Sequence, residues 1–194
     1  MQEIIKRDGE VYYLKNFLNP RDSLSLFEVL SRELEWRQDQ ITLFGKTHPV
    51  PRLQAWYGTP EASYSYSNIQ LKPKPFTKAL EDLRERLRIE LGLEFNGVLC
   101  NLYRTGRDYA AWHADNEKEL GLNPIIGSIS LGAVRKFSLR HATDGETIHL
   151  WPESGSLILM KGALQHHWKH QLGKTARAVS PRINLTFRRV MATP

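Results

Sequence analysis

The chain has little cysteine, no long apolar run and no low-complexity tract. Its one cysteine, Cys100, cannot form a disulfide within the chain. No stretch approaches the ~18 apolar residues needed to span a bilayer, and the first eight residues lack the apolar core of a secretory signal. These absences argue against a membrane or secreted protein. We therefore expect an intracellular monomer without a membrane partner, cytoplasmic in a bacterium or nuclear in a eukaryote.

The composition is that of an ordinary globular domain with an excess of positive charge. The 194 residues are 41% hydrophobic and 25% charged, and no internal repeat or linker indicates a second domain. The net charge is +6 and the sequence pI is about 9.5. A basic surface concentrates phosphate groups around a protein, so the charge favours a polyanionic partner, although many basic proteins bind no nucleic acid.

Two amphipathic helices are predicted in the first half of the chain. The first opens with Asn19 as N-cap and Pro20 at the first helical position. The second begins near Pro75 and stops at Gly92, which is a typical C-cap residue. Their apolar stripes predict that both helices cover a sheet.

Short β-rich runs divided by turn residues begin after Phe95, and their spacing is typical of a sandwich or jelly roll. The predicted strands are Val98 to Tyr103, Ser128 to Leu131, Lys136 to Arg140, Thr147 to Leu150, Ser156 to Met160 and Arg182 to Arg189. A further hairpin is predicted from Gln40 to Val50, with Phe44 and Gly45 near its tip. The sequence thus predicts an α+β fold that is mainly β.

The last predicted strand has one wholly polar face. Arg182, Asn184, Thr186 and Arg188 alternate with apolar residues, and a strand sends alternate side chains to opposite faces. A solvent-facing edge strand would also have this pattern. The two arginines could instead line a pocket for a small dicarboxylate, because guanidinium groups bind carboxylates bidentately. Asn101 and Tyr103 share a polar face in the same way.

His113 and Asp115 lie two positions apart and could chelate one metal ion. A distant histidine would complete the two-histidine, one-carboxylate set of non-haem Fe(II) sites. The spacing leaves several candidates for the third ligand, and among them His170 is the best placed because it shortly precedes the polar-faced strand. The candidates are His141, His149, His166, His167 and His170, whereas His48 is too far upstream.

Taken together, these motifs resemble the AlkB family of DNA and RNA alkylation-repair dioxygenases, from about Phe44 to Val190. The residues that carry the resemblance are Asn101-Leu102-Tyr103, His113-Ala114-Asp115, His170 and the segment Pro181 to Arg188. The resemblance implies a double-stranded β-helix, or jelly roll, with N-terminal helices and a nucleotide-recognition lid. It implies a single domain, with the helices and the lid in residues 1–94 and the catalytic core in residues 95–194.

The family's chemistry implies Fe(II), 2-oxoglutarate and O2. By resemblance, His113, Asp115 and His170 bind the iron. The cosubstrate would be held by Arg182, Asn101 and Tyr103 at its distal carboxylate and by Arg188, Asn184 and Thr186 near the chelating end. No side-chain nucleophile is needed. The implied reaction is oxidative demethylation of 1-methyladenine and 3-methylcytosine, which yields formaldehyde, succinate and CO2.

The lid segment is similar to that of the double-strand-preferring branch of the family. Phe44 would enter the duplex in place of the flipped base, unless it packs into the core. Tyr66 and the His113 ring would stack on the extruded base, and Tyr64 and Glu117 would contact its polar edge. DNA is therefore the expected partner, with RNA as the alternative. The basic residues expected beside the site are Arg135, Lys136, Arg140, Lys161, Lys169, Lys174 and Arg177.

Three other interpretations compete with this one. An oxygenase of the same fold acting on protein or a small molecule would keep the metal and carboxylate residues but need no wedge. A binding module without chemistry would make the metal set accidental. A zinc hydrolase would have no use for two arginines on one inward strand.

Overall fold

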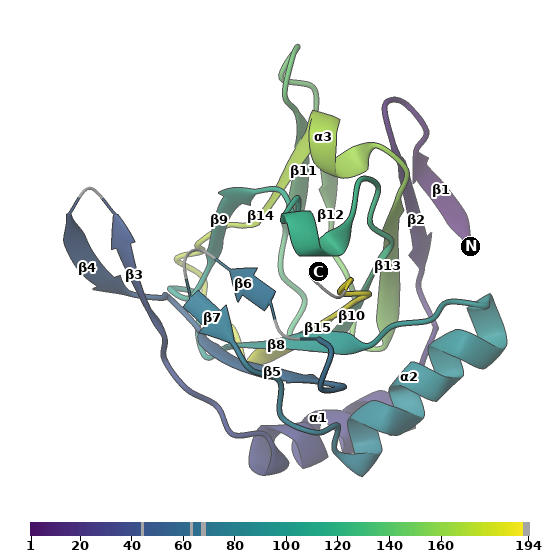
Figure 1. Ribbon diagram of the computed structural model, residues 1–194, viewed down its shortest axis with the longest axis vertical. Coiled ribbons are helices and arrows are strands. Elements are labelled where there is room, and N and C mark those ends of the chain that lie inside the picture. The colour runs from purple at the N-terminus through teal and green to yellow at the C-terminus, as the bar shows by residue number, and fades with distance from the viewer. Residues whose placement is uncertain (44, 63, 67–68, 192–194) are drawn as a thin grey trace.

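Two antiparallel sheets face each other in the computed structural model, which describes residues 1–43, 45–62, 64–66 and 69–191 (Figure 1). The larger sheet has seven strands in the order β1-β2-β13-β10-β15-β8-β5, and the smaller has four in the order β12-β11-β14-β9. The strands of the larger sheet are β1 Gln2–Ile5, β2 Glu10–Leu14, β5 Leu53–Gly58, β8 Gly97–Tyr103, β10 Ile126–Gly132, β13 Ser156–Lys161 and β15 Arg182–Arg188. Those of the smaller sheet are β9 Ala110–His113, β11 Phe137–His141, β12 Thr147–Leu150 and β14 Trp168–Leu172. The jelly-roll prediction is confirmed.

Two longer helices cover the outer face of the larger sheet (Figure 1). In α1, Pro20–Glu33, the Asn19 side chain accepts a hydrogen bond from the Asp22 amide at 2.9 Å, which confirms the predicted cap. The second helix, α2, spans Lys78–Leu91. It begins later than predicted because Thr77 is its N-cap, and it ends as predicted at Gly92, whose φ of 67° suits glycine.

The central strands of the larger sheet bury both of their faces. On β8 and β15, apolar side chains such as Cys100 and Leu185 join the helices in one core cluster. Their alternate neighbours, including Asn101 and Arg182, line a pocket on the opposite face, between the two sheets. A second apolar cluster joins the sheets to each other, with Leu139 and Trp168 of the smaller sheet packed near Ile158 of the larger one. The walls of the pocket are therefore packed against apolar clusters on their outer side and at its edge.

The structure contains several strands that the sequence analysis did not predict. Strands β1, β2, β5, β9 and β14 were not foreseen. Because β1, β2 and β5 belong to the larger sheet, residue 94 does not mark a boundary of that sheet. Two short helical segments, η1 Lys118–Leu120 and α3 Leu164–His167, lie in connections between strands.

Two small hairpins stand apart from the main sheets. The predicted hairpin is confirmed as β3 Gln40–Leu43 and β4 Lys46–Pro49, and it projects from the side of the two sheets (Figure 1). The second hairpin pairs β6 Tyr64–Tyr66 with β7 Ile69–Leu71. Within the described ranges, no helix has both the length and the apolar character needed to cross a membrane.

Candidate metal site and its polar pocket

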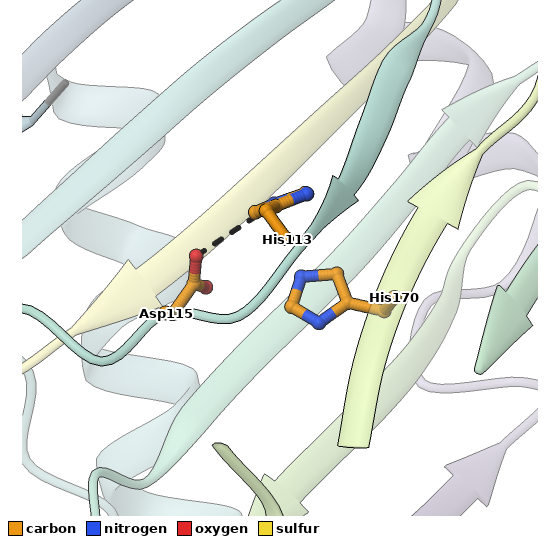
Figure 2. A group of neighbouring side chains, drawn as sticks. All are labelled: His113, Asp115 and His170. Carbon is orange, nitrogen blue, oxygen red and sulfur yellow. Dashed lines mark ion pairs between the residues drawn. The ribbon is translucent and has the colours of Figure 1, made fainter. Parts of the chain in front are cut away.

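Strands β9 and β14 bring two histidines of the predicted metal set side by side. His170 pairs directly with His113 across the ladder, and the ring centroids lie 4.3 Å apart. Asp115 follows the end of β9, and its Oδ1 lies 3.8 Å from Nε2 of His113. Figure 2 shows the three side chains pointing toward one another. Their potential ligand atoms all lie within 4.8 Å of one another, so one ion could contact all three.

Both histidines are held in the neutral form that metal binding requires. Burial lowers the pKa of His113, and it lowers the pKa of His170 to about 3, with the neighbouring His113 adding to the effect. Nδ1 of His113 lies 2.7 Å from the Ala111 carbonyl oxygen. That contact requires a proton on Nδ1, so the lone pair of a neutral ring is on Nε2, the nitrogen nearest Asp115.

Asp115 is a buried carboxylate with one oxygen neutralised and the other available. Burial alone would raise its pKa, but the charge and hydrogen bond of Arg188 together with the two histidines, His170 and His113, outweigh this effect and hold the pKa below its usual range. Nη2 of Arg188 lies 2.8 Å from Oδ2, and both side chains are buried. Among the described residues, Oδ1 of Asp115 has no hydrogen-bond partner. An unpartnered buried oxygen beside two neutral imidazoles fits a divalent metal and matches the donor set of non-haem Fe(II) sites.

A second polar cluster lies at the other end of the same pocket, around Arg182. Residue pairing across β15 and β8 places Arg182 opposite Tyr103, and the guanidinium carbon lies 5.6 Å from the centre of the tyrosine ring. Nη2 of Arg182 donates to the Ser130 hydroxyl at 2.8 Å, while Nε has no partner in the described part of the chain. Burial lowers the pKa of Arg182 to about 10, so it remains a cation at neutral pH. No described carboxylate pairs with this buried cation, so a bound carboxylate would fit beside it.

The other predicted cosubstrate residues also line the pocket, but some of their hydrogen-bonding groups are already bonded to protein atoms. Asn101 faces it from β8 and Thr186 from β15. The Asn184 amide nitrogen already donates to the Ser128 hydroxyl at 2.8 Å and to the Ile129 carbonyl at 3.0 Å. Thr186 donates to Asn184 Oδ1 at 3.2 Å. Asn184 therefore joins β15 to β10.

The predicted base-binding residues are only partly described. Glu117 is partly buried just beyond Asp115, and burial together with the Asp115 charge raises its pKa. Phe44, the wedge candidate, lies outside the described residues. The backbone of Tyr64 and Tyr66 forms β6, but their side chains lie outside what the structure describes.

Three residues in or beside the pocket were given no role in the sequence analysis. Arg52, just before β5, and Gln54 on it alternate with Leu53 and Ala55, which is the same polar alternation that marked the last strand. Gln165 lies in α3, and its side-chain oxygen accepts a hydrogen bond from the Asp115 backbone amide at 2.9 Å. The sequence around Gln165 gives no indication of this contact.

One basic residue expected at the surface is buried instead. Arg135 is 4% exposed, and its guanidinium donates to backbone carbonyls of the loops around it. Its acceptors are the carbonyls of Thr105, Gly106, Asp108 and Gly173. The expectation that Arg135 could contact phosphate is therefore wrong, because the side chain is buried and both of its terminal nitrogens donate to backbone carbonyls. Lys136, Lys169, Lys174 and Arg177 are exposed.

Comparison with known proteins agrees with this geometry. Residues 10–188 match the family model of the 2OG-Fe(II) oxygenase superfamily. The chain is 38% identical to alpha-ketoglutarate-dependent dioxygenase alkB homolog 3 of Bos taurus, with 92% of this chain and 65% of the relative aligned. It is 36% identical to the DNA oxidative demethylase ALKBH2 of Homo sapiens, with 87% of this chain and 69% of the relative aligned. The chain thus spans just under two thirds of the length of the bovine relative.

A solved structure shows the same fold. An oxidoreductase of the 2OG-Fe(II) oxygenase family from Burkholderia pseudomallei superposes with a TM-score of 0.62 at 11% identity, covering 94% of this chain and 87% of that one. This structural match shows the fold alone, whereas the sequence matches also indicate the family. The chain belongs to the 2OG-Fe(II) oxygenase superfamily and, within it, to the AlkB family.

Proposed function

We propose that the protein is an Fe(II)- and 2-oxoglutarate-dependent dioxygenase that removes N-alkyl groups from nucleic-acid bases, such as 1-methyladenine and 3-methylcytosine. Its products would be formaldehyde, succinate, CO2 and the restored base. The observation that carries the proposal is the presence, in one pocket, of the His113, Asp115 and His170 cluster and of the buried Arg182 cation, which no described carboxylate neutralises. A metal-chelating dicarboxylate needs both features.

The metal end of the pocket is built to hold Fe(II). His113, Asp115 and His170 would be the protein ligands, which leaves coordination positions open for the cosubstrate and O2. When bound, Fe(II) supplies the activation of O2 by which 2-oxoglutarate is decarboxylated and the alkyl carbon is oxidised. Arg188 holds the Asp115 carboxylate ionised and oriented, and Gln165 holds its backbone. These contacts support a preorganised ligand set.

The other end of the pocket would bind the distal carboxylate of 2-oxoglutarate. Arg182 supplies the buried charge, and Asn101 and Tyr103 lie beside it on the neighbouring strand. Asn184 and Thr186 line the space between this end and the metal cluster, next to Arg188 at the metal end. Side chains of both sheets surround the pocket and exclude bulk water, which strengthens each charged contact.

A cationic base suits the mouth of the site. Glu117 is a partly buried carboxyl group whose pKa is raised by burial and by Asp115, so a nearby positive ring would stabilise its ionised form. Tyr64 and Tyr66 would supply the polar edge contact and the stacking face, and Phe44 would be the wedge that replaces the flipped base. The names of the ALKBH2 relatives, DNA oxidative demethylases, support DNA as the substrate.

The surface charge supports a nucleic-acid substrate. The net charge is +6, and exposed lysines and arginines such as Lys169 and Lys174 lie on β14 or just after it. Phosphate contacts of this kind weaken as salt increases because bound counterions are released. We infer that DNA is bound by backbone contacts around the site, with RNA as the alternative that a direct comparison of substrates would reveal.

The test is lesion-dependent release of formaldehyde and succinate. The purified protein is incubated with Fe(II), 2-oxoglutarate, ascorbate and an oligonucleotide that contains 1-methyladenine or 3-methylcytosine. Unmethylated DNA and the methylated RNA of the same sequence serve as comparison substrates. Release should require the lesion, the iron and the cosubstrate.

Two histidine variants make the test specific. His113→Ala should abolish both products. His149→Ala should not, because His149 is exposed on β12 and bonds to Ser138 outside the pocket. Succinate without base repair would keep the oxygenase and reject the base substrate. Absence of both products from folded, iron-loaded protein would reject the proposal.

A further inference from the structure

The side chain of Asn101 is held by two donors at the start of the neighbouring strand β5, one on the strand and one just before it. Nε of Arg52 lies 2.7 Å from Oδ1 of Asn101, and Nε2 of Gln54 lies 3.1 Å from the same oxygen. Gln54 pairs directly with Asn101 across the β5–β8 ladder, so the two side chains leave the sheet on the same face. All three side chains are buried, with exposed fractions of 3–6%. The amide of Asn101 therefore has a fixed environment.

The chemistry of these partners determines which end of the amide faces the pocket. A guanidinium group has donors and no acceptor, so the atom that meets Arg52 must be the carbonyl oxygen of Asn101. The second donor, from Gln54, occupies the remaining lone pair of that oxygen. The NH2 group is then turned away from β5.

The other pocket asparagine differs in this respect. The NH2 group of Asn184 is already used by Ser128 and by the Ile129 carbonyl. Among the described residues, no protein acceptor is bonded to the NH2 group of Asn101, although the residue lines the pocket beside Arg182. Asn101 is thus the pocket amide with a donor left for a ligand.

We propose that Gln54 and Arg52 are positioning residues for 2-oxoglutarate, which hold Asn101 so that its NH2 group donates to a carboxylate of the cosubstrate. This inference rests on the proposed function. If the amide were turned by half a rotation, its carbonyl oxygen would face the carboxylate, and attraction would become repulsion. The contacts of Gln54 and Arg52 with Asn101 therefore determine whether the Asn101 amide attracts or repels the carboxylate.

Gln54 gives a cleaner test than Arg52. Arg52 also donates to the Tyr109 carbonyl at 3.2 Å, so a variant there would disturb the segment that leads into β9 and His113. Gln54→Glu replaces a donor with an acceptor in nearly the same volume, and it favours the inverted amide. Gln54→Met is the matched control, because it removes the donor without adding an acceptor and leaves the Arg52 contact in place.

The measurement is the dissociation constant of 2-oxoglutarate for Mn(II)-loaded protein, by titration calorimetry. We expect Gln54→Glu to weaken binding about tenfold, which corresponds to ~1.4 kcal/mol, and Gln54→Met to weaken it less. Mn(II) affinity should not change, because the metal cluster lies at the other end of the pocket. In steady state, Gln54→Glu should raise the KM for 2-oxoglutarate more than it lowers kcat.

A double-mutant cycle with Asn101→Ala separates positioning from a general structural effect. If Gln54 acts through Asn101, Gln54→Glu should change cosubstrate affinity less than about twofold in the Asn101→Ala background. Equal losses in both backgrounds, or unchanged affinity in the single variant, would overturn the inference. A wild-type protein that binds Mn(II) but no 2-oxoglutarate would instead reject the proposed function, and the inference with it.

Discussion

The charge of Arg182, which no described carboxylate neutralises, should lower the stability of the ligand-free protein. We consider the substitution Arg182→Met, which keeps the apolar stem and removes the guanidinium group. Arg182 is 3% exposed, and burial lowers its pKa to about 10. The drop from the ordinary arginine value corresponds to about 3 kcal/mol of unfavourable burial of the charge. Because the residue is charged in both the folded and unfolded states at neutral pH, this cost reduces the stability of the ligand-free protein.

The substitution should therefore have opposite effects on stability and on cosubstrate binding. Losing the hydrogen bond to Ser130 costs about 1 kcal/mol, so the ligand-free variant should gain about 2 kcal/mol in free energy of unfolding. For a domain of this size that gain raises Tm by about 4–8 °C. Losing the charged contact with the carboxylate should weaken 2-oxoglutarate binding about 100-fold, or ~2.7 kcal/mol.

Thermal unfolding with and without 2-oxoglutarate, on Mn(II)-loaded protein, measures both effects. The cosubstrate should raise the Tm of the wild type and leave that of Arg182→Met nearly unchanged at the same concentration. Arg135→Met is the matched control, because this buried arginine already bonds to backbone carbonyls, and its removal should lower Tm. A lower Tm for ligand-free Arg182→Met, together with an undiminished shift on adding 2-oxoglutarate, would refute the reasoning.

Four further predictions concern the metal cluster and the lid. His113→Ala or Asp115→Ala should abolish formaldehyde release and leave oligonucleotide binding largely intact by fluorescence anisotropy; activity in either variant would remove the metal assignment. Phe44→Ala should reduce repair of duplex more than of single-stranded substrate, and equal losses would make Phe44 structural. Gln165→Leu should weaken Mn(II) binding about tenfold by freeing the Asp115 backbone; unchanged affinity would contradict this. The pKa of His170 is about 3 in the folded protein, so below about pH 6.5 the unfolded histidine takes up a proton before the folded one does. The free energy of unfolding of the metal-free protein should therefore decrease as the pH falls below about 6.5. A free energy of unfolding that stays constant down to about pH 4 would contradict the buried neutral ring.

Local sequence signals predicted the two helices well, because the residues at their ends form the caps themselves. Asn19 and Pro20 determine the start of α1, and Gly92 the end of α2, through contacts within a few residues. The polar alternation of the last strand likewise predicted that its polar side chains share one face, because side-chain direction follows from the strand alone, whereas the inward orientation of that face depends on the fold. Such features need no knowledge of the remaining fold.

The elements that were missed depend on distant partners. Strand β14 reads Trp-Lys-His-Gln-Leu, and its buried positions include His170, so it lacks the apolar alternation of a core strand. The choice of His170 as third ligand could not be derived from spacing, since it follows from the pairing of β14 with β9 across the smaller sheet. Gln165 was missed for the same reason, because only the fold brings α3 against Asp115.

The buried polar residues of the pocket fall into two physical classes, according to whether a described protein group satisfies them. A buried polar group that finds a protein partner, as Asn184 does on Ser128, contributes to the fold and can be changed together with that partner. Asp115 Oδ1 and Arg182 Nε are buried without such a partner in the described structure, and desolvation makes each of them unfavourable for folding. The unfavourable burial of both groups is offset only by a ligand that brings a positive centre to Asp115 and a carboxylate to Arg182. Fe(II) chelated by a dicarboxylate meets that requirement, and either component alone leaves one of the two groups unsatisfied.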